Sequence, residues 1–169
     1  MKEIIVTGPE CSGKTTLARA LSVRLPGILV PEISRSLLTL TNNNYKERDL
    51  VTIARYQQFV RSTARITEKE WLVNDTGLLV IKVWSEFRFG KTDPFIDEGF
   101  YNTEVDLWLL CEPLQIWEDD GLRVNKNERE VLFSLYHDHL IQSGKPFKIV
   151  PAISEERRLN WTINCLSKI

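Results

Sequence analysis

The stretch Gly8-Pro9-Glu10-Cys11-Ser12-Gly13-Lys14-Thr15-Thr16 decides the fold of this chain. It fits the pattern G-x-x-x-x-G-K-[ST], in which glycines let a loop curl until successive backbone N–H groups face an anion. A short β-branched run, residues 3–7, precedes it, and residues 15–25 follow with apolar side chains at helical spacing. This context favours a phosphate-binding loop. The alternative is a helix-capping loop that matches by coincidence, which the strand and helix on either side make the weaker interpretation.

The loop predicts a nucleoside triphosphate ligand. Lys14 is expected to reach the β- and γ-phosphates, and the Thr15 hydroxyl is expected to bind Mg²⁺. The chain lacks the N-K-x-D guanine signature expected of a GTPase, but the preference between ATP and GTP as the donor stays open. ATP and Mg²⁺ are the predicted cofactors, and the predicted nucleotide-binding residues are Gly8, Pro9, Glu10, Cys11, Ser12, Gly13, Lys14, Thr15 and Thr16.

Length and composition place the chain among single-domain globular proteins. Its 169 residues and 19.6 kDa predict one domain over 1–169, and 43% hydrophobic with 27% charged residues is ordinary for that class. A net charge of −1 gives no support to a nucleic-acid or membrane partner. The cysteines Cys11, Cys111 and Cys165 lack the spacing of a zinc site, and no apolar signal segment is present. A cytoplasmic location is expected.

Short apolar runs alternate with amphipathic stretches along the whole chain. This alternation predicts a three-layer α/β fold of the P-loop NTPase type, with a parallel sheet of about five strands and helices on both faces. The expected strands are 4–7, 28–30, 71–74, 106–110 and 147–150, and the expected helices are 14–24, 34–40, 48–70, 78–87, 128–143 and 155–166. In such sheets ligands bind at the carboxyl ends of the strands.

Two carboxylates follow predicted strands at that edge. Glu32 comes directly after the second strand and could accept the proton of an attacking hydroxyl or hold sugar hydroxyls. It could equally be an acid that favours a helix N-terminus. Asp75 ends the third strand, where a second Mg²⁺-organising carboxylate is expected, although a turn or helix cap also uses Asp there. Which of the two takes the proton stays open.

Other polar side chains suit the acceptor. Gln57 falls within the apolar stripe of its helix, where an amide needs partners and suits a base edge, unless it bonds a neighbouring backbone group. Trp84 and Arg88 belong to a run of aromatic and basic residues. These side chains could form the floor of a site for a flat ligand, or they could simply pack at the end of a helix. The predicted substrate-binding residues are Glu32, Gln57, Trp84 and Arg88.

A long polar stretch, approximately residues 113–130, follows the fourth predicted strand. In P-loop kinases a mobile lid at this position brings arginines onto the transferring phosphoryl group and excludes water. Arg123 and Arg129 are the candidates here, although a plain surface connection would also be charged. The predicted catalytic residues are therefore Lys14, Asp75, Glu32, Arg123 and Arg129, and the predicted metal ligands are Thr15 and Asp75.

Together these residues resemble one family, the ribosylnicotinamide kinase domain of NadR-type NAD-salvage proteins. The run Lys82-Val83-Trp84-Ser85-Glu86-Phe87-Arg88 and the lid sequence Asp120-Gly121-Leu122-Arg123 carry most of the resemblance, because the glycine-rich loop is generic. The resemblance implies transfer of the ATP γ-phosphate to the 5′-hydroxyl of nicotinamide riboside, giving nicotinamide mononucleotide. It implies phosphate and metal roles for Lys14, Thr15, Asp75, Arg123 and Arg129.

The chain departs from the family at two positions. The family tends to read Asp-Thr-Asp where this chain has Asp75-Thr76-Gly77, and it often has an aromatic residue in place of Ile33. The acceptor therefore stays open between nicotinamide riboside and another nucleoside or nucleotide. From another functional class, a nucleotide-dependent regulator with slow ATPase activity is the alternative. The expected partner is a small nucleoside-type substrate, with no nucleic acid and no membrane.

Overall fold

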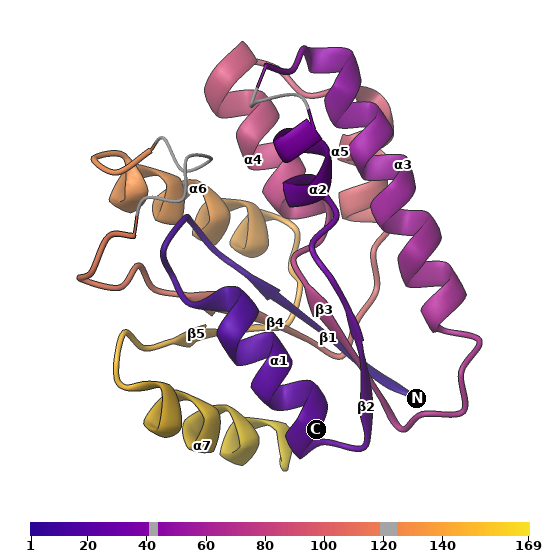
Figure 1. Ribbon diagram of the computed structural model, residues 1–169, viewed down its shortest axis with the longest axis vertical. Coiled ribbons are helices and arrows are strands. Elements are labelled where there is room, and N and C mark those ends of the chain that lie inside the picture. The colour runs from indigo at the N-terminus through magenta and orange to yellow at the C-terminus, as the bar shows by residue number, and fades with distance from the viewer. Residues whose placement is uncertain (41–43, 119–124) are drawn as a thin grey trace.

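The computed structural model describes residues 1–40, 44–118 and 125–169. Its strands form one parallel five-stranded sheet in the order β2-β3-β1-β4-β5 (Figure 1). The strands are β1 (Lys2–Thr7), β2 (Gly27–Val30), β3 (Trp71–Asp75), β4 (Leu107–Cys111) and β5 (Phe147–Val150). The predicted α/β fold of the P-loop NTPase type is confirmed.

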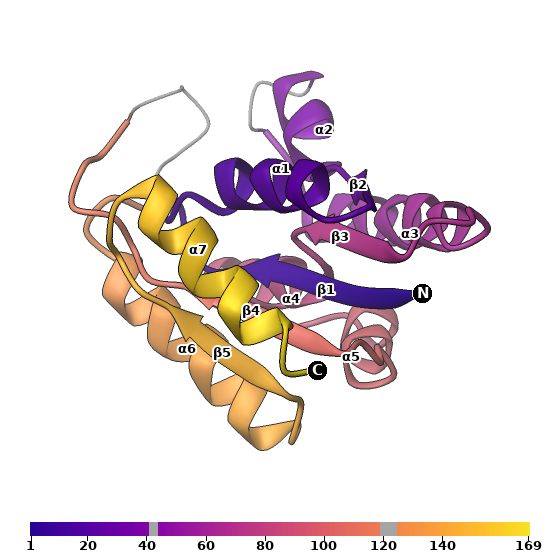
Figure 2. The same ribbon diagram turned by 90° about the horizontal axis from the view of Figure 1, so that it is seen from below.

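Helices cover both faces of the sheet. One face carries α1 and α7, which lie side by side, and the other carries α3, α4, α5 and α6, with α2 next to α3 (Figures 1 and 2). The helices are α1 (Lys14–Arg24), α2 (Ser34–Leu40), α3 (Glu47–Ala64), α4 (Leu78–Phe89), α5 (Pro94–Tyr101), α6 (Arg129–Gln142) and α7 (Glu155–Leu166). Among the described helices, none is long and apolar enough to span a membrane.

Each of the three central strands contains an apolar run, residues 4–6 in β1, residues 71–73 in β3 and Leu107–Cys111 in β4, because both of their faces are buried there. In β1, Ile4 and Val6 pack toward α1 and α7, whereas Ile5 packs toward the helices of the opposite face. Strand β4 alternates in the same way, with Leu109 on the first side and Trp108 on the second. Side chains of successive strand residues point to opposite faces, so one continuous apolar run supplies two cores.

Two helices differ from the sequence-based expectation. Helix α3 ends at Ala64 rather than at residue 70, because residues 65–70 are exposed and offer no apolar face to bury. Helix α5 was not predicted. It begins where the Asp93 carboxylate accepts from the backbone N–H of Phe95 at 2.9 Å, with Pro94 as the first helical residue, and it is too short to show a clear period.

The parallel arrangement brings the carboxyl ends of all five strands to one edge. The described segments that follow the strands at this edge are residues 8–13, 31–33, 76–77, 112–118 and 151–154. They are far apart in sequence and meet here because every crossover returns to the opposite edge before the next strand begins. This edge carries the candidate site.

Candidate functional site

The glycine-rich loop joins β1 to α1, and two glycines give it its shape. Gly8 has φ +136°, and a side chain there would begin 2.6 Å from the carbonyl oxygen of Cys111. Gly13 has φ +68°, which is the left-handed region, and caps α1. An L side chain is strained at such φ values, and at Gly8 it would also collide with the end of β4. The loop therefore curls closely against the sheet edge, as phosphate binding by backbone N–H groups requires.

The carbonyl oxygen of Pro9 collects two donors inside this loop. The Lys14 ammonium Nζ donates to it at 2.6 Å, and the Ser12 hydroxyl donates at 2.8 Å. Lys14 is thus directed back over the concave side of the loop rather than outward along α1. A bound phosphate would lie where this ammonium points.

Asp75 ends β3 beside the loop and is 2% exposed. Burial raises the pKa of its carboxyl above the usual range, and the nearby negative charge of Glu32 raises it further. The Thr15 hydroxyl and the charges of Lys14 and Arg19 act in the opposite direction. The structure therefore places Asp75 within electrostatic reach of the phosphate loop and of Glu32.

The site has the groups that a magnesium ion needs. The Oδ1 atom of Asp75 is buried and has no hydrogen-bond partner in the described part of the chain. A buried acceptor without a donor is costly unless a cation binds it. Within the described ranges no group of three or more His, Cys, Asp or Glu side chains could hold a metal by itself. One carboxylate, one hydroxyl, waters and phosphate oxygens are the ligand set that Mg²⁺ typically takes, and Thr15 and Asp75 fit it.

Glu32 lies in the loop after β2 and is held from two sides. Its Oε1 accepts from the Ser34 hydroxyl at 2.6 Å, and its Oε2 lies 3.6 Å from the Arg35 guanidinium Nε. Gln57 fixes the backbone on either side of it, accepting from the Ile33 N–H at 3.1 Å and donating to the Pro31 carbonyl at 3.3 Å. Two interpretations of Gln57 were open, contact with a base edge and hydrogen bonds to neighbouring backbone groups. The structure shows the hydrogen bonds to backbone groups.

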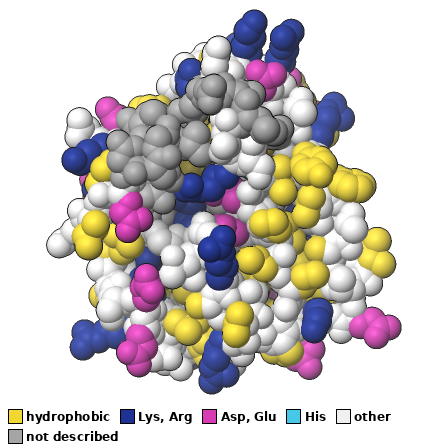
Figure 3. Space-filling model, viewed as in Figure 1, with side chains coloured by type: hydrophobic (Ala, Val, Ile, Leu, Met, Phe, Trp, Pro, Cys, Tyr) yellow, Lys and Arg dark blue, Asp and Glu magenta, His cyan; other side chains and the backbone are white. Residues whose placement is uncertain are grey.

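A large cavity opens between the phosphate loop and the loop that carries Glu32. Its volume is about 830 Å³, and a hollow that holds charged side chains of both signs is visible on this face of the molecule (Figure 3). Trp84 and Tyr136 give it aromatic walls from α4 and α6. Residues 8 and 10–16 of the loop line it together with Glu32 and Arg35.

Two predicted substrate residues do not line this cavity. Gln57 is buried behind the Glu32 loop, and Arg88 stacks its guanidinium over the Tyr45 ring at 4.2 Å. Trp84 and Glu32 do line it. The structure therefore brings together only part of the predicted acceptor set.

The described parts of the predicted lid contact the phosphate loop. The Leu114 N–H donates to the Cys11 carbonyl at 2.9 Å, and the Asn125 N–H donates to the Glu10 carboxylate at 2.9 Å. Arg129 is the first residue of α6, and its Nη1 donates to the Leu114 carbonyl at 2.5 Å. Arg123 lies outside the described residues. The segment 113–130 thus begins and ends against the loop that it was predicted to cover.

Sequence reasoning missed two residues of this cavity, Arg158 and Tyr136. Arg158 is 2% exposed, and its Nη1 donates to the Ser12 carbonyl at 2.8 Å. The signal was its spacing, because Arg158, Thr162 and Leu166 form the buried stripe of α7. A charged residue on such a stripe is unusual. For Tyr136, burial raises the pKa of the phenol well above its usual value, and the charges of Glu32 and Glu10 raise it further.

Residues 82–88 of α4, the run that carries much of the resemblance to NadR-type kinases, also connect α4 to its neighbouring helices. Lys82 is buried and bonds both the Glu86 carboxylate, at 2.8 Å, and the Asp97 carboxylate of α5. Glu86 also contacts the Nε2 atom of His139 in α6 at 2.5 Å. This cluster ties α4 to α5 and α6, and so fixes the helix that presents Trp84 to the cavity.

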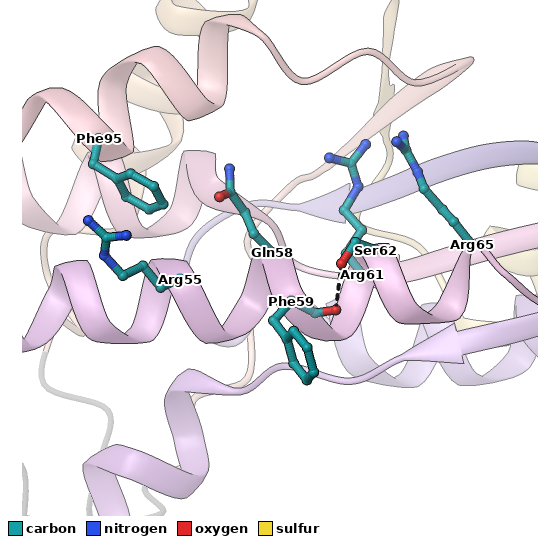
Figure 4. Close-up of a pocket in the computed structure, with 7 residues that line it drawn as sticks. All are labelled: Arg55, Gln58, Phe59, Arg61, Ser62, Arg65 and Phe95. Carbon is teal, nitrogen blue, oxygen red and sulfur yellow. Dashed lines mark hydrogen bonds between the residues drawn. The ribbon is translucent and has the colours of Figure 1, made fainter.

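A second cavity of about 510 Å³ lies on the surface of α3 and contains no residue of the phosphate loop. Figure 4 shows Arg61 and Arg65 extending from the same side of this helix, and Arg55 beside Phe95. Arg61 and Arg65 both pair with the buried carboxylate of Glu3 at the start of the sheet. These arginines therefore anchor α3 to β1.

The sheet order, the curled glycine loop and the position of Lys14 define a P-loop nucleotide-binding protein. The family model described as AAA domain matches residues 3–158, and the chain belongs to this family. Among curated proteins no sequence matches the chain.

Solved structures share the fold at low sequence identity. The NadR protein in complex with NR superposes with a TM-score of 0.86 at 20% identity, over 99% of this chain and 51% of that one. NadR in complex with NAD and AMP-PNP gives 0.82 at 18% identity, over 99% and 49%. A deoxyadenosine kinase from M. mycoides with bound dATP gives 0.69 at 15% identity, over 99% and 100%. The chain thus spans about half the length of the NadR chains, and the likeness concerns the fold.

Proposed function

We propose that the chain is an ATP- and Mg²⁺-dependent small-molecule kinase that phosphorylates nicotinamide riboside at the 5′-hydroxyl, giving nicotinamide mononucleotide. One observation carries the proposal. The phosphate loop and Glu32 line a single cavity together with the aromatic side chains of Trp84 and Tyr136. A nucleotide donor and a hydroxyl acceptor would therefore meet in one enclosed space, which is what in-line phosphoryl transfer requires. The fold shared with the NadR protein that binds NR supports this choice of acceptor.

At the donor end, the phosphate loop and Lys14 bind the β- and γ-phosphates and offset the negative charge on the transferring group. Thr15 and Asp75 hold the metal. When bound, Mg²⁺ supplies charge neutralisation to the phosphate oxygens. Asp75 is assigned to the metal rather than to the acceptor because it is almost fully buried and, unlike Glu32, does not line the cavity.

At the acceptor end, Glu32 accepts a hydrogen bond from the attacking hydroxyl. It takes the proton of that hydroxyl as the new oxygen–phosphorus bond forms and the bond from the same phosphorus to the leaving oxygen of ADP breaks. Contacts with Ser34 and Arg35 hold the Glu32 carboxylate in place, and the hydrogen bonds of Gln57 hold the backbone beside it. Gln57 therefore serves the substrate through Glu32. The indole of Trp84 offers a flat π surface, and the pyridinium ring of nicotinamide is a flat cation, so stacking adds cation–π attraction. Arg88, which was expected near the substrate, supports α4 from outside through Tyr45.

The segment 113–130 is proposed as the lid. Its two ends already contact the phosphate loop through Leu114 and Asn125. Arg123 and Arg129 are the proposed lid arginines, and Arg129 would exchange its bond to the Leu114 carbonyl for a phosphate oxygen on closure. Closing this segment over the loop excludes water, so that the hydroxyl of the acceptor is the available nucleophile.

The proposal is tested by identifying the product. The protein is incubated with Mg-ATP and nicotinamide riboside, and the mixture is analysed by mass spectrometry and phosphorus NMR. Nicotinamide mononucleotide and ADP in equal amounts are expected, and Glu32→Gln should reduce their formation while nucleotide binding is retained. If a panel of nucleosides that includes deoxyadenosine gives a different nucleoside monophosphate, the assignment as a kinase stands and the assignment of nicotinamide riboside as the acceptor is replaced. ADP with free phosphate and no phosphorylated acceptor would contradict the proposal and favour a nucleotide-dependent regulator.

A further inference from the structure

Arg158 lies against the Ser12–Gly13 peptide of the phosphate loop, on the first turn of α7. Its Nη1 donates to the Ser12 carbonyl at 2.8 Å, and a side chain on Gly13 would begin 2.5 Å from the same nitrogen. The guanidinium therefore rests directly on the Ser12–Gly13 peptide. It also belongs to the lining of the nucleotide cavity.

This contact sets the orientation of one peptide group. In a planar trans peptide the C=O and the following N–H point in opposite directions. Because the Ser12 carbonyl points toward Arg158 on α7, the Gly13 N–H of the same peptide points away from Arg158. That N–H is one of the donors that a P-loop offers to phosphate.

Among the described residues, no side chain compensates the charge of Arg158. The side chain is 2% exposed, and in the described part of the chain its Nε and Nη2 atoms have no hydrogen-bond partner and no carboxylate pairs with it. A buried cation without a partner is unfavourable for folding. Its position in the first turn of α7 adds to the cost, because the N-terminal end of a helix is already positive. A residue that is costly to the free protein needs a compensating interaction elsewhere.

We propose that Arg158 is a positioning residue of the phosphate loop and the counter-charge of the bound nucleotide's phosphates. It acts through the Ser12–Gly13 peptide and through its field across the loop. In a buried environment such a field is weakly screened, so a phosphate bound by the loop interacts strongly with the buried cation beside it. The inference rests on nucleotide binding by the P-loop and is independent of which acceptor is phosphorylated.

Three variants separate this role from a structural one. Arg158→Met keeps the length of the side chain and removes its charge and its donors. Arg158→Lys keeps the charge and loses the planar fork. Arg157→Met removes a charge from the neighbouring exposed position of the same helix and is the matched control. For each protein, the affinity for Mg-ADP is measured by titration calorimetry, and thermal unfolding is followed with and without Mg-ADP.

Arg158→Met is expected to weaken Mg-ADP binding by about ten- to a hundredfold, the range for losing a hydrogen bond to a charged group. Its melting temperature without nucleotide should be equal to or higher than that of the unaltered protein, and the stabilisation by Mg-ADP should shrink. Arg158→Lys should bind with intermediate affinity, and it carries the test if the methionine variant does not fold. Arg157→Met should change affinity by less than about twofold.

Unchanged Mg-ADP affinity in Arg158→Met would overturn the proposal. So would a fall in melting temperature without nucleotide that accounts for the whole loss, because that is the signature of a structural residue. If Arg158→Lys binds Mg-ADP no better than Arg158→Met does, the charge of Arg158 does not contribute to nucleotide binding, and its proposed role as a counter-charge is wrong. Because Mg-ADP binding needs no acceptor, a wrong acceptor assignment would be seen in turnover and not in this measurement.

Discussion

The Lys14 ammonium and the Pro9 carbonyl are joined at 2.6 Å across the phosphate loop. A nucleotide phosphate would compete with this carbonyl for the same ammonium, and the Ser12 hydroxyl would remain as a donor to Pro9. Lys14→Ala is therefore expected to leave the fold intact and to lower turnover by about a hundred- to a thousandfold or more. Steady-state kinetics and thermal unfolding check both parts.

The matched control for Lys14 is Lys69→Ala, which removes the same charge from an exposed position before β3. It should behave as the unaltered protein does. A Lys14→Ala protein with full activity would contradict the assignment of the phosphate loop.

Asp75 links the metal site to the stability of the free protein. Burial and the charge of Glu32 raise the pKa of the Asp75 carboxyl. The folded state therefore binds the carboxyl proton more tightly than the unfolded state, in which the pKa of this group is near 3.8. The contribution of Asp75 to stability is therefore fully present below pH 3.8 and is lost as the pH rises through the raised pKa. Asp75→Asn should raise the melting temperature at neutral pH and lower Mg²⁺-dependent turnover by at least about a hundredfold.

The advantage of Asp75→Asn in melting temperature should disappear in acid, when both proteins are neutral at this position. Unfolding curves between pH 3 and pH 8, taken without metal, give the comparison. If the asparagine variant melts below the unaltered protein at neutral pH, then Asp75 stabilises the fold, and the argument from burial is wrong. Removing Mg²⁺ with a chelator should abolish turnover in the unaltered protein.

Gln57 supports the acceptor side without lining the cavity. Gln57→Leu removes its bonds to the Ile33 N–H and the Pro31 carbonyl and leaves two backbone groups without partners, at a cost of about 1–3 kcal/mol in stability. Because Glu32 lies between those groups, the variant should also lower kcat in the same direction as Glu32→Gln. Thr52→Ala, an exposed change on the same helix, is the control. If the Gln57→Leu protein is destabilised but its kcat is unchanged, then Gln57 does not support the acceptor site through Glu32.

The cluster around Glu86 predicts a pH-dependent contribution to stability. Burial opposes ionisation of Glu86, but the hydrogen bonds and charges of Lys82 and His139 outweigh it, and the pKa of Glu86 lies below its ordinary value of 4.5. A depressed pKa stabilises the fold above the unfolded value, and this stabilisation is lost as the pH falls through the folded value. Glu86→Gln should destabilise the protein at pH 7 by about 1–3 kcal/mol.

The difference between Glu86→Gln and the unaltered protein should vanish well below pH 4.5, where both carry a neutral side chain at position 86. Denaturant unfolding at several pH values measures it. Affinity for the acceptor, measured at temperatures where both proteins are folded, should change little. A large loss of acceptor affinity with unchanged stability would instead make Glu86 a substrate residue.

The fold and the nucleotide half of the site could be predicted because their signals are local. The strand before the loop, Gly8, Gly13, Lys14 and the helix after it are contiguous, and Asp75 and Glu32 each follow an apolar strand directly. Parallel strand order then brings these segments to one edge. Helix α5 escaped prediction because its main signal is a cap, Asp93, on a helix too short to show a period.

The remaining residues depend on which elements pack together. Gln57 was recognised as a buried amide, but its partners, the backbone groups of Pro31 and Ile33, are set by how α3 crosses the loop after β2. Arg158 lies far from the phosphate loop in sequence, and only the packing of α7 beside α1 brings them into contact. The spacing of Arg158, Thr162 and Leu166 indicates that Arg158 is buried, but it does not indicate which loop Arg158 contacts.

ADP release from Mg-ATP, measured first without an acceptor and then with nicotinamide riboside, tests the central claim most directly. A kinase of this acceptor should release ADP about tenfold faster or more when the hydroxyl is present and oriented by Glu32. Deoxyadenosine and other nucleosides in parallel identify a different acceptor. ADP release that is the same with every acceptor and without any would contradict the account of a small-molecule kinase.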